Sequence, residues 1–326
     1  MPELPEVQTT VSGLNSRVSG LTITDVWTDY GSAFYKGKDS IKNPVFFRRF
    51  KKEVVGAKIT GVTRRAKNIL IHIEKPHGKA GDKEKIILVH MKMTGHILYA
   101  RFNLDAKKSA KKQRDPWTPA TDESKAFHDP FNRFIHFVMT LSNGRQIALS
   151  DMRKFAKVTL IDGAHAETGL LHSLHLANIG PEPLEKSFTF DIFKSRINRK
   201  PNGKIKMVLM DQSIIAGVGN IYSDEALWRT GLNPEERVKN IPDSLLKTLY
   251  ADVKKVLEKG IDFGGDSMSD YRNIDGERGK FQEQHQAYRK TGKPCARPGC
   301  KGIIQRKIVG GRSAHFCSVH QRLRKN

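Results

Sequence analysis

The spacing of apolar residues along the chain has two different periods, and the change of period separates a strand-rich part from a helical part. Residues 3–20 show the spacing of an amphipathic helix that ends at Gly20. Residues 21–100 form short runs that are alternating or entirely apolar, as in half-buried and fully buried strands. The clearest of these runs are 23–27, 58–62, 69–73 and 86–90. Strands spaced this closely predict a β-sandwich or a barrel.

Helical spacing returns in the second half of the chain, after a last strand signal at 133–141. Glycine and proline punctuate residues 162–185, which we interpret as a linker. An amphipathic helix is predicted at 244–259, with leucine and valine on its buried face. The predicted fold is therefore α+β with several domains. These are an N-terminal helix with a β-sandwich over 1–161, the linker over 162–185, a helical domain over 186–287 and a small C-terminal hairpin over 288–326.

A basic segment at about 101–132 interrupts the strand pattern. It contains the run Lys-Lys-Ser-Ala-Lys-Lys-Gln-Arg over 107–114, followed by two prolines that flank Trp117. We predict a mobile loop, inserted into the sandwich. Two interpretations of this loop stay open: it adds nonspecific affinity for phosphates, or it is solvated and has no function.

The charge of the chain indicates a polyanionic partner. There are 57 Lys and Arg against 34 Asp and Glu, which gives a formal net charge of +23 and a pI near 9.9. This favours nucleic acid first and an anionic membrane surface second. No apolar run approaches the ~20 residues of a membrane span, and the start lacks a signal-peptide pattern. The three cysteines all follow residue 294, which predicts a metal site in a reducing cytoplasm rather than disulfides.

The first six residues, Met-Pro-Glu-Leu-Pro-Glu, carry a specific chemical signal. Removal of Met1 leaves Pro2 with a free secondary amine, which titrates near pH ~8 and can attack an aldehyde-level sugar carbon. The product is an iminium, because no N–H remains to be lost, and an iminium is a strong electron sink. Glu3 and Glu6 are three residues apart, so a helix places both carboxylates on one side. The same residues are also ordinary helix-start chemistry, which is the competing interpretation.

Two pairs of possible metal ligands lie near the end of the chain, and a Gly-Gly turn can join them. Cys295 and Cys300 form the first pair, and Cys317 and His320 form the second. Three thiolates and one imidazole make a tetrahedral Zn²⁺ set, and such a closed set is structural because it leaves no open position. We predict one structural zinc ion, with three unrelated thiols as the alternative.

Six stretches, in matching order along nearly the whole chain, resemble the formamidopyrimidine-DNA glycosylases, bacterial enzymes that excise oxidised purines from DNA. These stretches are Pro2–Glu6, Arg64–Lys67, His90–Gly95, Asp151–Phe155, Gly180–Leu184 and Ile215–Tyr222. The resemblance implies that the helical domain contains a helix-two-turn-helix element and that the C-terminal hairpin is a zinc finger. The sequence departs from the family at Met152 and Lys154. It departs again in the metal set, where the first cysteine pair is wider and His320 replaces a cysteine.

The resemblance also implies the catalytic residues. Pro2 is the nucleophile, Glu3 is the general acid/base, and Glu6 is a supporting group. Lys67 acts beside the lesion, and Arg312 grips the phosphates there and is counted with the catalytic residues.

A further set of residues is implied to bind DNA. Met93, Arg153 and Phe155 enter the space that the extruded base leaves in the duplex. The residues implied to hold the bent backbone are Lys206, Asn220 and Arg312.

The function implied by the resemblance is base-excision repair. The enzyme excises 8-oxoguanine and formamidopyrimidines from double-stranded DNA and cleaves the abasic strand by β,δ-elimination through the Pro2 iminium. We expect a cytoplasmic, nucleoid-associated monomer with no membrane partner. Two alternatives stay open: an endonuclease VIII-like enzyme that prefers oxidised pyrimidines, and a non-catalytic protein that binds damaged DNA.

Overall fold

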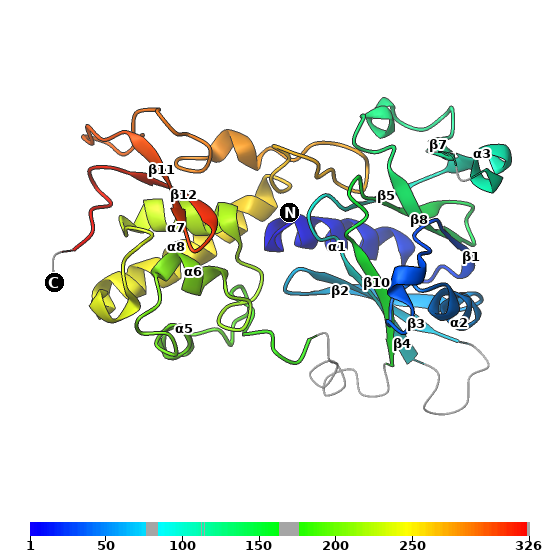
Figure 1. Ribbon diagram of the computed structural model, residues 1–326, viewed down its shortest axis with the longest axis horizontal. Helices are drawn as coiled ribbons and strands as arrows, with labels where there is room; N and C mark the ends of the chain where they lie inside the picture. Colours follow the sequence, from blue (N-terminus) through cyan, green and yellow to red (C-terminus); the bar gives the residue numbers. More distant parts are fainter. Residues whose placement is uncertain (76–83, 112, 114, 163–175, 325–326) are drawn as a thin grey trace. The chain divides into compact units, whose positions relative to one another are not determined.

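The computed structural model describes residues 1–326 except 76–83, 112, 114, 163–175 and 325–326 (Figure 1). The chain divides into two compact units, each with its own hydrophobic core. The first unit contains residues 1–2, 6–177 and 264–279, and the second contains 3–5, 178–263 and 280–326. Most of the expected linker, 163–175, lies outside the described residues.

Two four-stranded antiparallel sheets form the first unit. One sheet has the order β1 (Ile23–Thr28), β8 (Ile135–Leu141), β9 (Gln146–Ser150) and β5 (His96–Ala100). The other has the order β10 (Lys157–Asp162), β4 (Glu84–His90), β3 (Asn68–Glu74) and β2 (Lys58–Arg65). Apolar side chains of both sheets share one core, so the predicted β-sandwich is confirmed.

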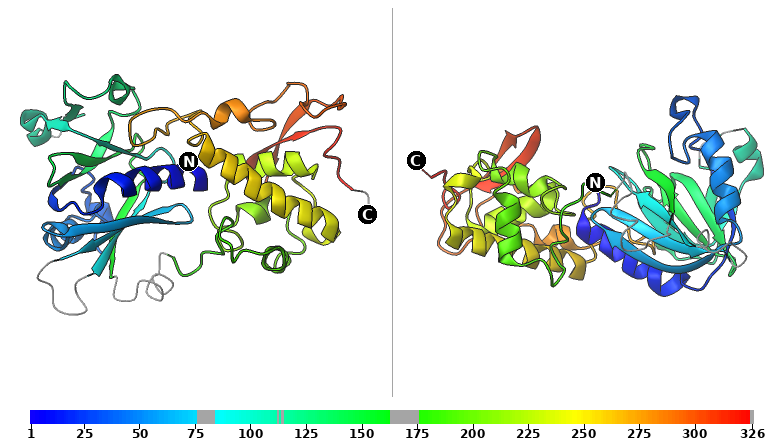
Figure 2. Two further views of the ribbon diagram at one scale, coloured as in Figure 1. Left: turned by 180° about the vertical axis from the view of Figure 1, so that it is seen from behind. Right: turned by 90° about the horizontal axis from the view of Figure 1, so that it is seen from below.

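Helix α1 (Leu4–Val18) contributes its regularly spaced apolar residues to the core of the sandwich. These residues are Val7, Val11, Leu14 and Val18. Figure 2 shows α1 lying alongside the strands. The N-terminal helix predicted at 3–20 is therefore confirmed.

A second helix, α2 (Pro44–Val54), corrects the prediction that only strands occur between 21 and 100. Asn43 caps it, and Pro44 occupies its first turn, where a missing N–H costs nothing. Phe46, Phe50 and Val54 are buried at helical spacing. The short helix η1 (Ala33–Tyr35) also lies in this part of the chain.

The described part of the basic insertion, which leaves out residues 112 and 114, is folded, and this corrects the prediction of a mobile loop. It contains β6 (Phe102–Leu104), α3 (Ala106–Ala110), β7 (Trp117–Pro119) and η2 (Lys125–His128). The two strands pair, and Phe102, Trp117 and Phe127 join a separate apolar cluster with residues of β5, β8 and β9. Three large aromatic side chains are enough to hold the segment on the sheet, because each buries a large apolar area.

The second unit is mainly helical. Its helices are α5 (Phe190–Ile197), α6 (Ile205–Met210), α7 (Asn220–Thr230) and α8 (Asp243–Asp262), with the short turns η3 (Val238–Asn240) and η4 (Phe281–Gln284). The C-terminal hairpin, β11 (Ile304–Val309) and β12 (Arg312–Cys317), clusters with these helices. The predicted helix at 244–259 corresponds to α8.

Residues 264–279 belong to the first unit, although the sequence placed them with the helical domain. Ile274 is buried in the core of the sandwich, and its carbonyl accepts a hydrogen bond from Tyr99 N at 2.8 Å. Arg272 forms an ion pair with Asp129 at 2.9 Å. These contacts are made between residues far apart in sequence, so local pattern gave no sign of them.

Candidate active site and metal centre

The Glu3 carboxylate lies at the N-terminus of α7. It is 3% exposed, and it accepts hydrogen bonds from Ile221 N at 2.9 Å and Tyr222 N at 3.4 Å. A Cβ on Gly219 would lie 2.4 to 2.7 Å from the carboxylate atoms, so a side chain there would displace Glu3. The positive end of the helix dipole also favours a carboxylate at this position. The predicted acid/base is thus held in one orientation.

Glu6 holds a different segment of the chain. Its Oε1 accepts a hydrogen bond from Asp266 N at 2.7 Å, and its carbonyl accepts one from the Tyr271 hydroxyl at 3.1 Å. Burial raises the pKa of Tyr271, so its hydroxyl remains a donor. A Cβ on Gly265 would lie 2.8 Å from Glu6 Cγ. Glu6 therefore fixes the 264–271 segment against α1, which fits a supporting role.

Lys67 lies at the end of the sheet where three loops of the first unit meet. Asn68, His90 and Lys157 are paired across β3, β4 and β10, so the residues next to them share one edge. Lys67 lies in the two-residue turn that joins β2 to β3 and is 7% exposed. Burial, together with the charges of Lys92, Lys67 and Lys157, lowers the pKa of His90 to about 3. The edge is thus strongly positive around a neutral histidine.

Asp151 connects two loops that carry predicted DNA-binding residues. Its side chain is fully buried and accepts hydrogen bonds from the Thr94 hydroxyl, from the Tyr30 hydroxyl at 3.1 Å and from Ala156 N at 2.7 Å. Thr94 Oγ1 in turn accepts a hydrogen bond from Arg153 N at 3.2 Å. Thr94 follows Met93 directly, so the Met93 loop and the Arg153 loop are held together. Neither Asp151 nor Thr94 was predicted from the sequence to hold these loops.

The side chains at the tips of these loops are accessible. Phe155 is 48% exposed, and the Arg153 guanidinium lies 4.4 Å from the centre of its ring. Lys154 between them has a left-handed backbone, with φ of 54°, and its carbonyl accepts a hydrogen bond from Lys42 Nζ at 2.6 Å. Met93 is half-buried. The structure thus brings the three predicted wedge residues onto two adjoining loops of one unit.

In the second unit, Gln212 shapes the turn between α6 and α7. Its amide group donates to Val218 O at 2.8 Å, and its oxygen accepts from Gly217 N at 2.9 Å. Gly217 has a φ of 80°, and a Cβ there would lie 2.6 Å from Leu4 Cβ. Asn220 begins α7, and its side-chain oxygen has no hydrogen-bond partner within the described part of the chain. Gln212 was not identified from sequence.

Lys206 does not have the position that sequence analysis gave it. The side chain has no exposed area, and its Nζ forms a 2.6 Å ion pair with the equally buried Asp224. Nζ also donates to Ser223 Oγ at 3.3 Å and to Asn220 O at 3.4 Å. A buried ammonium that is paired in this way cannot touch a phosphate. The prediction of a direct DNA contact at Lys206 is wrong.

Asp224 also holds the C-terminal hairpin to the helices. Its Oδ2 accepts a hydrogen bond from His315 N at 2.9 Å and lies 2.9 Å from His315 Nδ1. At the tip of the hairpin, a Cβ on Gly310 would lie 2.6 Å from the sulfur of Met207 in α6. The exposed Arg312 begins β12 directly after this tip. The hairpin therefore presents Arg312 beside the α6 helix.

The four predicted ligands lie together in a cluster that could hold a metal ion. The ligand atoms of Cys295, Cys300, Cys317 and His320 are all within 4.8 Å of one another. His320 Nε2 donates to the Trp228 carbonyl at 3.0 Å, which leaves Nδ1 facing the thiols, 3.4 Å from Cys295 Sγ. Metal-binding histidines commonly use the second nitrogen in this way. The donor set fits a single metal ion and has no further chemistry to offer.

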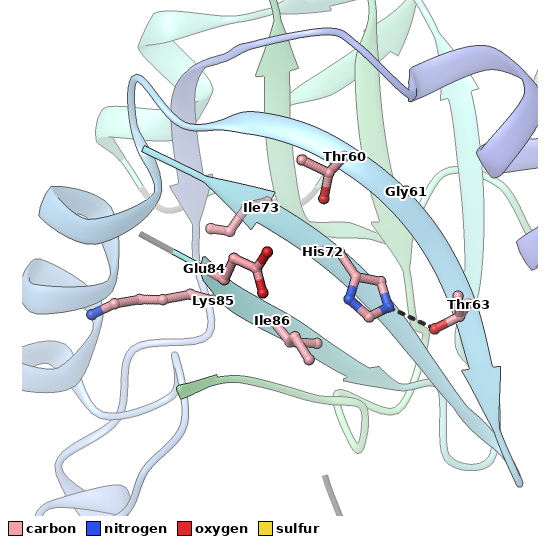
Figure 3. Close-up of a pocket in the computed structure, with 8 residues that line it drawn as sticks. All are labelled: Thr60, Gly61, Thr63, His72, Ile73, Glu84, Lys85 and Ile86. Carbon is pink, nitrogen blue, oxygen red and sulfur yellow. Dashed lines mark hydrogen bonds between the residues drawn. The ribbon is translucent and has the colours of Figure 1, made fainter. Parts of the chain in front are cut away.

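A separate cavity of about 320 Å³ lies on strands β2, β3 and β4 (Figure 3). His72 Nε2 and Thr63 Oγ1 are 2.7 Å apart in it, and Glu84 lies on the neighbouring strand. None of the predicted site residues lines this cavity. It therefore plays no part in the site described above.

No helix in the part of the chain that the structure describes has the length and apolar character needed to cross a membrane.

Comparison with known proteins adds independent information. Residues 1–158 match the family model "Formamidopyrimidine-DNA glycosylase N-terminal domain", and residues 179–272 match "Formamidopyrimidine-DNA glycosylase H2TH domain". The formamidopyrimidine-DNA glycosylase of Pelotomaculum thermopropionicum is 34% identical over 325 residues, 99% of this chain and 100% of that protein. That of Bacillus subtilis is 32% identical over 321 residues, 98% of this chain and 99% of that protein.

Solved structures give the same result. Lactococcus lactis Fpg in complex with abasic-site DNA has a TM-score of 0.76 and 29% identity, over 98% of this chain and 99% of that one. A complex of MutM with DNA containing carbocyclic 8-oxo-G has a TM-score of 0.75 and 30% identity, over 98% of this chain and 100% of that one.

Proposed function

Because this chain belongs to the formamidopyrimidine-DNA glycosylase family, we propose that it excises oxidised purines from duplex DNA and then cleaves the abasic strand. One observation carries the proposal: Pro2-Glu3 begins a chain that matches this family along nearly its whole length, and the Glu3 carboxylate is held in place by Ile221 and Tyr222. Similar proteins have been solved with DNA containing 8-oxo-G and Fapy-dG, which supports these lesions as substrates.

The proposed chemistry begins at Pro2, once Met1 is removed. The amine attacks C1′ of the damaged nucleotide, and the glycosidic bond breaks with its electron pair leaving on the base. The C1′–O4′ bond of the sugar then opens, its electron pair goes to O4′, and O4′ takes up a proton. The resulting iminium acidifies C2′, so a proton is lost there and the bond to the 3′ phosphate breaks. A second elimination breaks the bond to the 5′ phosphate and leaves a one-nucleotide gap. Glu3, the residue next to the nucleophile, moves protons on the sugar.

Lys67 would act beside the lesion, where it contacts the base or phosphate and assists proton transfer. Its position at a positively charged sheet edge supports this role, because an anionic backbone is attracted there. The duplex must also release the damaged base, which costs a few kcal/mol. Met93, Arg153 and Phe155 would fill the vacated space, and the accessible Arg153–Phe155 pair supports this.

Asn220 and Arg312 would hold the phosphates on either side of the lesion. The exposed side chain of Arg312 supports this role, because a guanidinium donates hydrogen bonds to phosphate oxygens. Lys206 acts indirectly, because it orients the first turn of α7 from within the core.

We propose that the metal centre holds Zn²⁺ through Cys295, Cys300, Cys317 and His320. A structural zinc ion stabilises a small hairpin that has little core of its own. The role of this hairpin is to carry Arg312. We further propose a monomer that works on the bacterial nucleoid in the cytoplasm. The placement of all three cysteines in the metal set supports a reducing compartment.

Borohydride trapping tests the proposed function. The protein is incubated with duplexes that contain 8-oxoguanine opposite cytosine or thymine glycol opposite adenine, and cross-linked product is measured. We expect a strong cross-link to the first duplex that is greatly reduced in Pro2→Gly. In Glu3→Gln, base excision should be lost while binding is kept, with thermal unfolding as the check on folding.

Three outcomes would contradict the proposal. A protein that binds damaged DNA but forms no cross-link is a binding protein only. A cross-link confined to thymine glycol indicates the pyrimidine-specific enzyme. Excision at the wild-type rate in Glu3→Gln removes Glu3 from the chemistry.

A further inference from the structure

We propose that the inserted segment 101–132 is a second phosphate-binding surface, in which the lysines of α3 bind the backbone of the same duplex beside the Arg153–Phe155 loop. The inference rests on the proposed function in taking duplex DNA as the partner. It assigns a ligand to a part of the chain that no catalytic or wedge residue occupies.

The acidic and basic side chains of the segment differ in whether they have partners. All of its acidic side chains have partners in the structure. Asp105 caps α3 by accepting a hydrogen bond from Lys108 N at 3.0 Å. The remaining acids pair with arginines: Asp115 with Arg133, Asp122 with Arg101, Glu123 with Arg101 and Arg145, and Asp129 with Arg272.

The described lysines on α3 and at its C-terminal end lack such partners. Lys107, Lys108 and Lys111 on α3 and its C-terminal end are exposed, and none forms an ion pair with any residue that the structure describes. Four of the five acids are thus neutralised by arginines, while these lysines keep their charge for a ligand outside the chain. A row of unpaired lysines recruits phosphates by releasing their counterions.

The helix that carries the lysines is held by the folded strands of the insertion. The strands β6 and β7 pair antiparallel on either side of α3, and Trp117 packs edge-on against Trp27 with 5.6 Å between ring centres. Asp105 N donates to Pro116 O at 2.8 Å, which closes the segment beneath the helix. A preorganised helix loses less entropy on binding than a mobile loop. Figure 1 shows α3 and β7 side by side at one edge of the first unit.

Within the first unit, α3 lies close to the loop that carries Arg153 and Phe155. A cavity of about 380 Å³ is lined by Ser109 and Gln113 of the insertion together with Asp29 and Lys154. Lys154 lies between Arg153 and Phe155, so α3 borders the loop that carries them. We therefore expect a duplex bound by that loop to pass close to α3.

The test is the salt dependence of binding to an undamaged duplex. We compare the full-length protein with K107Q/K108Q/K111Q and with K247Q/K255Q/K259Q, which removes the same charge from exposed positions on α8. We expect the slope of log K against log [salt] to become shallower by roughly 0.9 for each lost phosphate contact, about 2 to 3 in total. Between ~1 M and ~0.1 M salt, the wild type should therefore gain roughly a hundredfold or more in affinity over the first variant. The second variant should match the wild type.

Each outcome decides the inference. Equal slopes for all three proteins overturn it, as does an equal loss in both variants, which would indicate net charge alone. Thermal unfolding verifies that both variants fold. Because the duplex is undamaged, failure here is distinguishable from failure of the proposed function, which would appear as absence of a cross-link in the wild type.

Discussion

Each unit of the protein uses one fully buried aspartate to hold the backbone of predicted DNA-binding residues, and the two aspartates have different partners. In the first unit, Asp151 binds neutral donors: the hydroxyls of Thr94 and Tyr30 and a backbone amide. In the second unit, Asp224 binds the Lys206 ammonium and the backbone and ring of His315.

The difference shows two ways to place exposed side chains accurately. Neutral donors can be lost one at a time, each at a moderate cost. Removal of one partner of a buried ion pair costs more stability, because the other charge stays buried without a counterion. We therefore expect a single substitution of a buried residue to lower the free energy of unfolding more in the helical unit than in the sandwich. The predictions below test this contrast in order of expected effect.

The largest effect is expected from removal of the metal. The hairpin β11–β12 has a small apolar cluster of its own, and structural zinc contributes about 10 kcal/mol or more in isolated zinc fingers. Chelation should therefore unfold the hairpin and weaken DNA binding, while the sandwich keeps its stability. Amide hydrogen exchange of the two units checks this. Equal protection of the hairpin with and without chelator would contradict it.

Substitution of Asp224 should have the next largest effect. Asp224→Ala leaves the fully buried Lys206 without its anion, so we expect a loss of about 3 to 5 kcal/mol in the free energy of unfolding. Asp243→Ala is the control, because the exposed pair Asp243–Lys194 should contribute at most about 1 kcal/mol. Urea unfolding measures both. Similar losses in the two variants would remove the contrast.

Substitution of Asp151 should cost less. Asp151→Ala leaves neutral donors without an acceptor, which corresponds to about 1 to 3 kcal/mol in the free energy of unfolding. Because both wedge loops lose their common anchor, excision should slow more than stability alone explains. The exposed Asp122→Ala is the control for both measurements. A loss of stability in Asp151→Ala larger than in Asp224→Ala would reverse the comparison between the units.

Mild acid should destabilise the sandwich by a graded amount. Burial lowers the pKa of His96 to about 4 and that of His90 to about 3. Below pH ~6.5 the unfolded chain binds protons that the folded chain does not, so stability falls by up to about 1.4 kcal/mol per pH unit for each histidine. Urea unfolding between pH 7.5 and 5, followed by tryptophan fluorescence, measures the slope. His96→Gln should make it shallower; an unchanged slope would exclude His96.

Local sequence pattern was sufficient for the elements with strong periodicity. The helices at 4–18 and 243–262 and the strands β1, β2, β3, β4 and β8 have the periods that their buried faces require. The metal set was also readable, because ligand type and spacing are local properties. The exposed tips, such as Arg153 and Phe155, were identified through family resemblance.

The contacts behind the site could not be predicted, because they depend on residues that are distant in sequence. Asp151 meets Tyr30 across more than a hundred residues, and Asp224 meets His315 across a similar separation. Lys206 was misassigned for the same reason, since nothing near it in sequence shows that an aspartate would bury it. The insertion was judged by its lysines, whereas its fold is determined by three separate aromatic residues.

The three thiols of the metal centre make the proposed repair activity sensitive to oxidants. Cys300 is half-buried and therefore within reach of peroxide, and its conversion to sulfenic acid would remove one ligand. Loss of that ligand would release the ion, and the strand that begins at Arg312 would lose the contact that orders it. The conditions that create oxidised purines would then also disable the enzyme proposed to remove them, until thiol reduction and fresh zinc restored it.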